Sequence, residues 1–300
     1  MGPFVRTARS GGMQLREQVG HFVKPRWILG AMALGVLVAV PAANATPARS
    51  NPDVRSGAFY VLDQSDSSVL AARNEHVAAP IASITKLMTA IVVLEAGQPM
   101  DERLSITRED VKGTAGGSSR LAAGTKLSRA DFLHLALMSS ENRAAHTLCR
   151  NYPGGLKSCV KAMNEKAKSL GMKSARFVEP TGLSSSNVAS PEDLAKLVLA
   201  SGKYPVIRQY STDPDHTVRV NRQPLEFRNT NLLVKNPNWD VTVQKTGYIS
   251  EAGRCLVMQA VIDGRDVVIV LLNSWGKLTR IGDANRIRNW MESQRLAKAS

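Results

Sequence analysis

Strand-like segments near both ends of the chain enclose a middle in which apolar residues recur at helical spacing. On the N-terminal side, residues 57–70 predict a strand, a polar turn and a second strand. On the C-terminal side, Asp263-Gly264 is typical of a hairpin turn, and strands are predicted over 240–246, 255–262 and 265–272. We therefore expect an α+β fold: an antiparallel sheet built from both chain ends, with helices packed on it and a mostly helical insertion.

The predicted insertion covers roughly residues 79–205. Its first helix starts at Ser83, continues with apolar residues at helical spacing and stops at Gly97. Further helices, the last with Ser190 as N-cap, are predicted over 129–138, 142–150, 156–170 and 191–200.

The remainder of the chain contains a loop-like stretch at 211–239 and a basic amphipathic helix at 280–296. No internal repeat or convincing interdomain linker interrupts the pattern. Residues 46–300 are therefore expected to form a single domain.

The N-terminal segment has the pattern of a secretory signal peptide. Five basic residues precede an uncharged stretch of 13 residues from Ile28 to Val40, and Ala43-Asn44-Ala45 has the small-x-small form of a cleavage site. The stretch is too short to span a bilayer comfortably, although an uncleaved anchor is the alternative. We expect cleavage of residues 1–45 and export to the periplasm.

The composition is that of a globular protein, with 43% hydrophobic and 21% charged residues, which excludes disordered and collagen-like chains. The net charge of +14 falls to +10 without residues 1–45, because 34 basic and 24 acidic residues remain. Such a charge suggests an anionic partner. The basic residues are scattered and aromatic residues make up 5% of the chain, so we expect no nucleic-acid binding.

The three cysteines lie in the exported part of the chain, where disulfides form. Cys149 and Cys159 bracket a strong turn signal, so a disulfide between them is expected, whereas Cys255 lies in an apolar run and is expected to be a buried free thiol. His146 stands one helical turn before Cys149, but no fourth ligand has a usual zinc spacing. No metal site is predicted.

Ser83-Ile84-Thr85-Lys86 places a lysine one helical turn after a serine at the start of an apolar helix. Lysine can take the proton of a serine hydroxyl if burial or a nearby cation destabilises its ammonium form. The same spacing occurs without this context at Ser158 with Lys161 and at Ser274 with Lys277. The alternative is an N-cap serine followed by a surface lysine.

Ser140-Glu141-Asn142 lies at a junction between two predicted helices. The hydroxyl of Ser140 could relay a proton, and the amide of Asn142 could hold a substrate carbonyl. Helix capping is the alternative for this motif taken alone.

Lys245-Thr246-Gly247 is expected at the end of a strand, where it offers a cation and a hydroxyl to a carboxylate. Gly247 would let a substrate backbone lie close to that strand. The alternative is an ordinary strand end.

Taken together and in this order, the three motifs match the pattern of class A β-lactamases and penicillin-binding proteins. From about Gly57 to Trp290 the chain resembles the low-molecular-mass penicillin-binding proteins, the serine D-alanyl-D-alanine peptidases. Within them it looks most like the D-alanyl-D-alanine endopeptidase group of penicillin-binding protein seven. The resemblance extends to 177–183, 229–232, 252–254 and 276–280. It implies a β-lactamase/transpeptidase-like fold.

The resemblance also implies residue roles and a reaction without metal or cofactor. Substrate would be held by Asn142, Lys245, Thr246, Gly247 and, on a weaker match, Arg280. Catalysis would use Ser83 as nucleophile, Lys86 as general base, Ser140 as proton relay and the backbone N–H groups of Ser83 and Tyr248 as oxyanion hole.

We therefore expect a periplasmic hydrolase that cuts peptidoglycan crosslinks between D-alanine and meso-diaminopimelate and is inhibited by β-lactams. The alternatives are a D-alanyl-D-alanine carboxypeptidase, a class A-like β-lactamase and a non-catalytic binding module. Thr-Gly-Leu follows Glu179-Pro180 where the β-lactamase loop has Leu-Asn, so Glu179 is given no deacylating role. The chain ends soon after the last predicted helix, and no membrane anchor is expected after signal cleavage.

Overall fold

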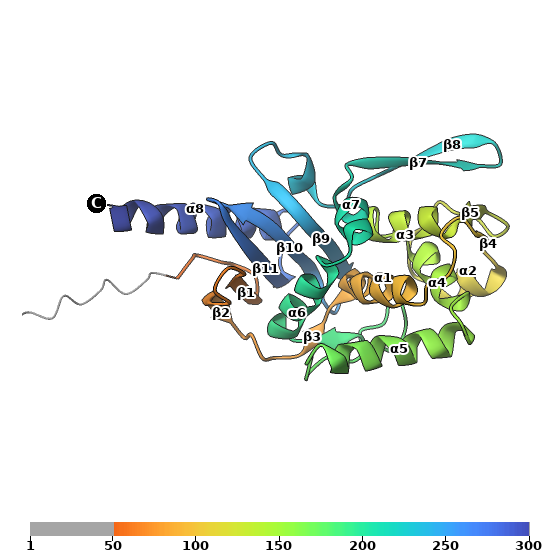
Figure 1. The fold of residues 1–300 in the computed structure, drawn as a ribbon, viewed down its shortest axis with the longest axis horizontal. Coiled ribbons are helices and arrows are strands. Elements are labelled where there is room, and N and C mark those ends of the chain that lie inside the picture. The colour runs from red at the N-terminus through yellow and green to blue at the C-terminus, as the bar shows by residue number, and fades with distance from the viewer. Residues whose placement is uncertain (1–50, 300) are drawn as a thin grey trace, which may run out of the picture. The chain divides into compact units, whose positions relative to one another are not determined.

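A five-stranded antiparallel sheet lies at the centre of the computed structural model, which describes residues 51–299, with side chains described to residue 294. The strand order is β2-β1-β11-β10-β9. The two halves come from opposite ends of the chain (Figure 1): β1 (Ala58–Asp63) and β2 (Val69–Arg73), then β9 (Asp240–Ile249), β10 (Gly253–Ile262) and β11 (Arg265–Ser274). The predicted α+β arrangement is confirmed.

The two halves of the sheet join where β1 pairs with β11, with Tyr60 opposite Val270. Every residue of β1 is buried, as expected for a strand covered on both faces. The predicted hairpin between β10 and β11 is present, since both Asp263 and Gly264 have the positive φ of a tight two-residue turn.

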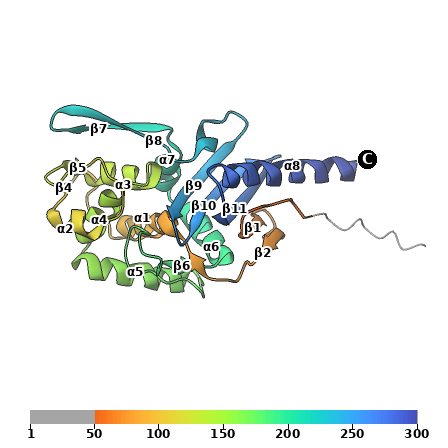
Figure 2. The same ribbon diagram turned by 180° about the vertical axis from the view of Figure 1, so that it is seen from behind.

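Helices cover both faces of the sheet. One face packs against α8 (Thr279–Ala299) (Figure 2). Ile287 and Met291 of this helix join a cluster with Leu256 and Leu271. The other face carries α6 (Pro191–Ser201), which begins at the predicted N-cap Ser190.

The helical part surrounds α1 (Thr85–Glu95), which is buried along nine of its eleven residues. Around it lie α2 (Arg108–Gly113), α3 (Arg129–Met138), α4 (Asn142–Arg150) and α5 (Gly155–Ser169). The strand pairs β3 (Ala79–Pro80) with β6 (Val188–Ala189) and β4 (Arg103–Ser105) with β5 (Lys126–Ser128) complete this part. A buried central helix explains why α1 is apolar on nearly all sides.

The predicted loop at 211–239 is wrong, because most of it is regular structure. After α7 (Pro205–Thr212), the strands β7 (Asp215–Val220) and β8 (Gln223–Arg228) form a ribbon beside α3 and β5 (Figure 1), followed by the 3-10 helix η2 (Leu232–Lys235). Most of the ribbon is solvent-exposed, so it lacks the alternation of apolar residues, and Pro224 lies within a strand.

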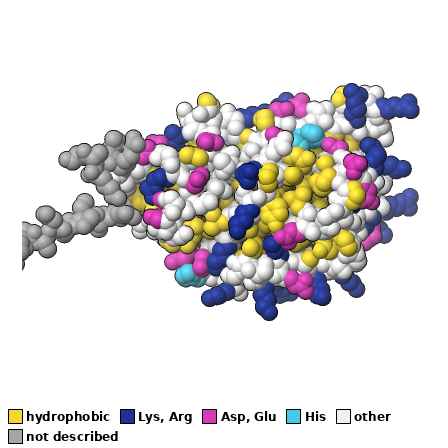
Figure 3. Space-filling model, in the orientation of Figure 1, with side chains coloured by type: hydrophobic (Ala, Val, Ile, Leu, Met, Phe, Trp, Pro, Cys, Tyr) yellow, Lys and Arg dark blue, Asp and Glu magenta, His cyan; other side chains and the backbone are white. Residues whose placement is uncertain are grey.

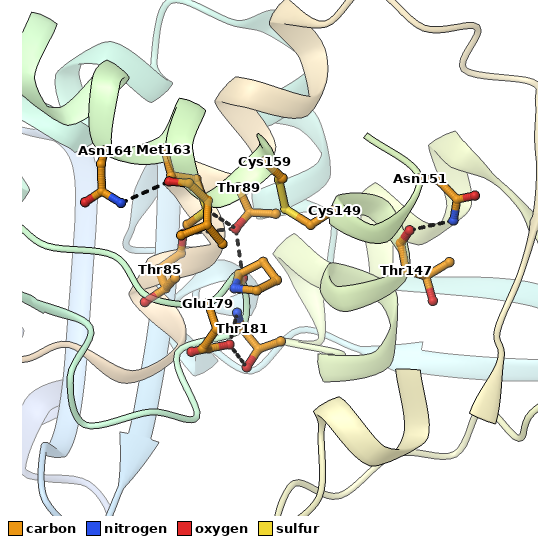
Figure 4. The surroundings of a disulfide bond; sticks show 12 residues. Thr85, Thr89, Thr147, Cys149, Asn151, Cys159, Met163, Asn164, Glu179 and Thr181 are labelled. Atoms are coloured by element: carbon orange, nitrogen blue, oxygen red, sulfur yellow. Dashed lines mark hydrogen bonds between the residues drawn. A yellow bond between two sulfur atoms is a disulfide. The ribbon is translucent and has the colours of Figure 1, made fainter. Parts of the chain in front are cut away.

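The predicted disulfide joins Cys149 at the end of α4 to Cys159 in α5, with their Cα atoms 5.4 Å apart (Figure 4). Cys255 is a buried free thiol, as expected. The predicted signal peptide, residues 1–45, lies outside the described residues. Between residues 51 and 299, no helix combines the length and apolar character needed to cross a membrane.

Candidate active site

Ser83 lies in a 3-10 turn, η1 (Ala82–Ile84), directly before α1. The turn is tight, because Ala82 has a φ of 48°, in the left-handed region that non-glycine residues rarely adopt. Neither η1 nor α1 has a side-chain capping bond at its start. The capping alternative for Ser83 is therefore wrong.

Lys86 is buried, with 1% of its surface exposed, so the surface-lysine alternative is also wrong. Its Nζ lies 2.8 Å from Ser83 Oγ, 2.8 Å from Asn142 Oδ1 and 2.6 Å from the Thr181 carbonyl oxygen. Burial lowers the pKa of Lys86 to about 7, although the charges of Glu179 and Glu141 act in the opposite direction. Near neutral pH a large fraction of this amine is therefore unprotonated and able to accept a proton.

Ser140 and Asn142 lie at the junction of α3 and α4, where Ser140 has a φ of 63°. Glu141 is the N-cap of α4, because its side chain accepts a hydrogen bond from the backbone N–H of Arg143 at 3.1 Å. Ser140 lines the same cavity as Ser83. The side-chain carbonyl oxygen of Asn142 accepts a hydrogen bond from Lys86, which leaves the amide NH₂ of Asn142 as a donor for a substrate carbonyl.

Lys245, Thr246 and Gly247 lie inside β9, which continues to Ile249, so the predicted strand end is three residues too early. Lys245 is fully buried and its Nζ donates to the Thr246 carbonyl at 3.0 Å. Its pKa is lowered by burial and by the positive charges of Lys86 and Arg280. An incoming anion would relieve this accumulation of positive charge.

The close approach that requires glycine at position 247 differs from the expected one. A Cβ at this position would lie 3.0 Å from the Ile81 carbonyl oxygen and 3.1 Å from the Ser83 nitrogen. The missing side chain thus lets β9 approach the η1 turn of the protein itself, rather than only a substrate backbone. Gly182 is more tightly constrained, with a φ of +81° and a Cβ position 1.8 Å from the Ala82 carbonyl oxygen.

A cavity of about 570 Å³ brings most predicted site residues together. Its wall includes Ser83, Ser140, Asn142, Thr246, Gly247, Tyr248 and Arg280, while Lys86 and Lys245 are buried behind it. A second cavity of about 430 Å³, between the β1–β2 turn and α8, contains none of these residues. Among the described side chains, no group of three or more His, Cys, Asp or Glu is placed to hold a metal ion.

Arg280, in the first turn of α8, lines this cavity. Its Nε and Nη1 are buried and have no hydrogen-bond partner. Burial and the neighbouring charge of Arg254 lower the pKa of Arg280. A carboxylate in the cavity would offset the positive charge of this guanidinium.

The loop of residues 179–184 also contributes to the site, although the sequence motifs did not predict it. The Glu179 carboxylate accepts the backbone N–H group of Thr181 at 2.6 Å (Figure 4). It also accepts the backbone N–H groups of Gly182 at 2.6 Å and of Ser184 at 3.3 Å. It thereby holds the turn whose Thr181 carbonyl accepts a hydrogen bond from Lys86. The resemblance had included this segment, but nothing in its residue types shows that the contact is made by a backbone carbonyl.

Comparison with known proteins gives matches over most of the chain. Residues 45–276 match the family described as D-alanyl-D-alanine carboxypeptidase. A Pseudomonas aeruginosa D-alanyl-D-alanine endopeptidase is 50% identical over 244 residues, which is 80% of this chain and 78% of that protein. The Escherichia coli D-alanyl-D-alanine endopeptidase is 44% identical over 278 residues, 90% of each chain.

Solved structures agree with the sequence matches. The crystal structure of D-alanyl-D-alanine carboxypeptidase from Mycobacterium tuberculosis superimposes with a TM-score of 0.74 at 26% identity, covering 83% of this chain and 95% of that one. Fold, motif order and sequence identity thus point to one group of proteins. The chain belongs to the D-alanyl-D-alanine carboxypeptidase family of serine peptidases.

Proposed function

We propose that this protein is a serine D-alanyl-D-alanine endopeptidase that hydrolyses the D-alanyl to meso-diaminopimelate crosslink of peptidoglycan through an acyl-enzyme on Ser83. The contact that carries the proposal is the 2.8 Å hydrogen bond between Lys86 Nζ and Ser83 Oγ. It places an amine with a pKa of about 7 against a hydroxyl at the cavity wall. Such a pair is the requirement for an activated serine nucleophile.

In the acylation step, Lys86 takes the proton of Ser83 while Oγ attacks the D-alanyl carbonyl carbon. The oxyanion that forms would be held by the backbone N–H groups of Ser83 and Tyr248, each donor of this kind contributing about 3 kcal/mol. Ser140 passes a proton from Lys86 to the amine as the carbon–nitrogen bond breaks. A water molecule then attacks the ester, giving the free D-alanyl carboxylate and restoring Ser83.

The carboxylate next to the scissile bond would be bound by Thr246, by the buried Lys245 and by the partly buried Arg280. Thr246 Oγ1 lies 2.6 Å from Thr230 Oγ1, and either hydroxyl could be the donor of this hydrogen bond. When Thr230 donates, the single proton of the Thr246 hydroxyl is available to the substrate carboxylate. The unpaired donors of Arg280 support this assignment.

Sequence identity to relatives with known names favours the endopeptidase reaction over the carboxypeptidase reaction. The relatives named endopeptidases are 50% and 44% identical, whereas the structurally similar carboxypeptidase is 26% identical. A β-lactamase activity is disfavoured because the Glu179 carboxylate is engaged by the backbone of its own loop. Covalent inhibition by β-lactams follows from the same serine.

The cellular setting is part of the proposal. Residues 1–45 would direct export to the periplasm and be removed, and residues 46–300 would form one catalytic domain with the helical part, about 79–205, inserted in the sheet part. On the face shown in Figure 3, Lys and Arg side chains are spread out and interspersed with Asp and Glu, unlike the clustered basic patch that is typical of nucleic-acid-binding proteins.

The test is to incubate the purified protein with crosslinked dimer muropeptides and with monomeric pentapeptide and to identify the products. We expect dimers to be cut to monomers faster than pentapeptide loses D-alanine. Preferential release of D-alanine would make the protein a carboxypeptidase. Rapid, repeated turnover of penicillin would make it a β-lactamase.

A further inference from the structure

Exposed apolar side chains gather at one end of the sheet, next to the cavity. Six large hydrophobic residues are exposed in the described part of the chain, and three of them are Tyr248 at 56%, Trp275 at 81% and Leu278 at 58%. Tyr248 directly follows Gly247 and lines the cavity, and Leu278 lies two residues before Arg280. Exposed apolar residues grouped beside a site, rather than scattered singly, indicate a binding surface.

Arg254 lies in the middle of this group. On β10 it pairs in register with Tyr248 of β9 and with Ser274 of β11, the residue before Trp275. Its guanidinium lies 4.6 Å from the centroid of the Tyr248 ring. The three strands thus bring Arg254 and the Trp275 loop to the same edge of the molecule as Tyr248, the member of the group that lines the cavity.

This edge also carries positive charge that the protein does not neutralise. Arg254 lies close enough to Arg280 to lower the pKa of Arg280. Neither arginine forms an ion pair with any carboxylate in the described part of the chain. Two neighbouring guanidinium groups without acidic partners favour a ligand with more than one negative charge.

The two candidate substrates differ in what lies on this side of the scissile bond. In a terminal D-alanine the leaving amine carries one carboxylate and a methyl group. In a crosslink it carries one carboxylate and a methylene chain that leads into a second stem peptide, the acceptor stem, with further carboxylates. Only the crosslink can place apolar carbon over exposed aromatic residues and offer an anion to a second arginine.

We propose that Tyr248, Arg254 and the Trp275–Leu278 loop form a subsite for the acceptor stem, in which Arg254 pairs with a carboxylate of that stem beyond the one held by Lys245, Thr246 and Arg280. This inference rests on the proposed crosslink cleavage and adds the element that distinguishes a crosslink from a terminal D-alanine. The methylene chain of the diaminopimelate residue lies over the exposed apolar side chains.

The test compares three readouts in Arg254→Gln and wild type: cleavage of dimer muropeptide, D-alanine release from pentapeptide, and acylation by fluorescent penicillin. A lost charge-assisted hydrogen bond is typically worth about 1.5–3 kcal/mol, so kcat/KM for the dimer should fall roughly 10- to 100-fold. The other two readouts should change less than about threefold, because neither substrate has an acceptor stem. Arg254→Lys should restore part of the dimer activity.

Trp275→Ala should lower dimer cleavage several-fold without loss of folding, since the side chain is 81% exposed. The matched controls are Val69→Ala, an exposed apolar residue on the opposite edge strand β2, and Arg222→Gln, an exposed arginine in the turn of the β7–β8 ribbon. Neither should change any readout.

An equal loss of all three readouts in Arg254→Gln would overturn the subsite, because Arg254 would then support the shared site through Tyr248 or Arg280. An unchanged dimer rate would also overturn it. Failure of the proposed function is a separate outcome, since the wild-type protein would then fail to cut dimers or to bind penicillin at all.

Discussion

The floor and the rim of the cavity are built in opposite ways. At the floor, the buried Nζ of Lys86 has three hydrogen-bond partners within 2.8 Å, and Lys245 donates to the Thr246 carbonyl. At the rim, Arg280 has buried donors without partners, and Trp275 is 81% exposed. The fixed floor suits chemistry that is the same for every substrate, whereas the open rim suits recognition of what extends beyond the scissile bond.

The largest loss of activity is expected from a substitution at the floor of the cavity, at Ser83. Ser83→Ala should abolish both penicillin labelling and muropeptide cleavage, because no other hydroxyl is placed 2.8 Å from Lys86 Nζ in the described structure. Ser158→Ala, in the second Ser-x-x-Lys pair of the chain, should label normally. Gel fluorescence and mass spectrometry of the labelled peptide provide the measurement. Cleavage that survives in Ser83→Ala would remove the covalent mechanism.

The two buried lysines should respond differently to the same change. Lys86→Arg should slow acylation by roughly 10²- to 10⁴-fold, because a guanidinium does not act as a base at neutral pH. Lys245→Arg keeps the cation and should mainly raise KM. Lys161→Arg, whose side chain is 77% exposed, is the control. Equal and mild effects at positions 86 and 245 would contradict their separate roles.

Glu179 should influence Lys86 in two ways, through its negative charge and through the loop that it holds. Glu179→Gln keeps one oxygen acceptor but loses the negative charge that raises the pKa of Lys86, so the pH midpoint of acylation should move to lower pH. The maximal rate should also fall, by about tenfold, because the turn that carries Thr181 loses part of its backbone hydrogen bonding. A lower rate with an unmoved midpoint would limit Glu179 to a structural role.

The smallest expected effect on activity concerns the disulfide between α4 and α5. Replacing Cys149 and Cys159 by alanine should lower the free energy of unfolding by about 2–3 kcal/mol, while penicillin labelling at 25 °C stays near normal. Denaturant unfolding gives the stability change. Two free thiols in non-reduced peptides of the purified protein would contradict the bond.

The sequence predicted the buried elements and missed the exposed ones for a physical reason. Helix α1 and strand β11 are packed on all sides, so their apolar residues mark them clearly. The β7–β8 ribbon is mostly in contact with solvent, and its polar residues read as a loop.

The candidate site shows a similar division. The order of the motifs predicted Ser83, Lys86, Asn142 and Thr246 as site residues, because the chemical groups that they contribute belong to their side chains and can be read from the sequence. The contact from the Thr181 carbonyl could not be predicted, since every residue has a carbonyl and only the folded loop decides which one faces Lys86. The same limit explains why the close approach of Gly247 to the η1 turn appears only in the structure.

The pH dependence of acylation tests the role of Lys86 most directly. The rate of penicillin acylation, followed by stopped-flow fluorescence between pH 5 and 9, should rise with pH as the amine loses its proton. The midpoint should lie near the pKa of about 7 that burial gives Lys86. A flat profile, or the same midpoint in the residual activity of Lys86→Arg, would contradict the assignment of Lys86 as the base that activates Ser83.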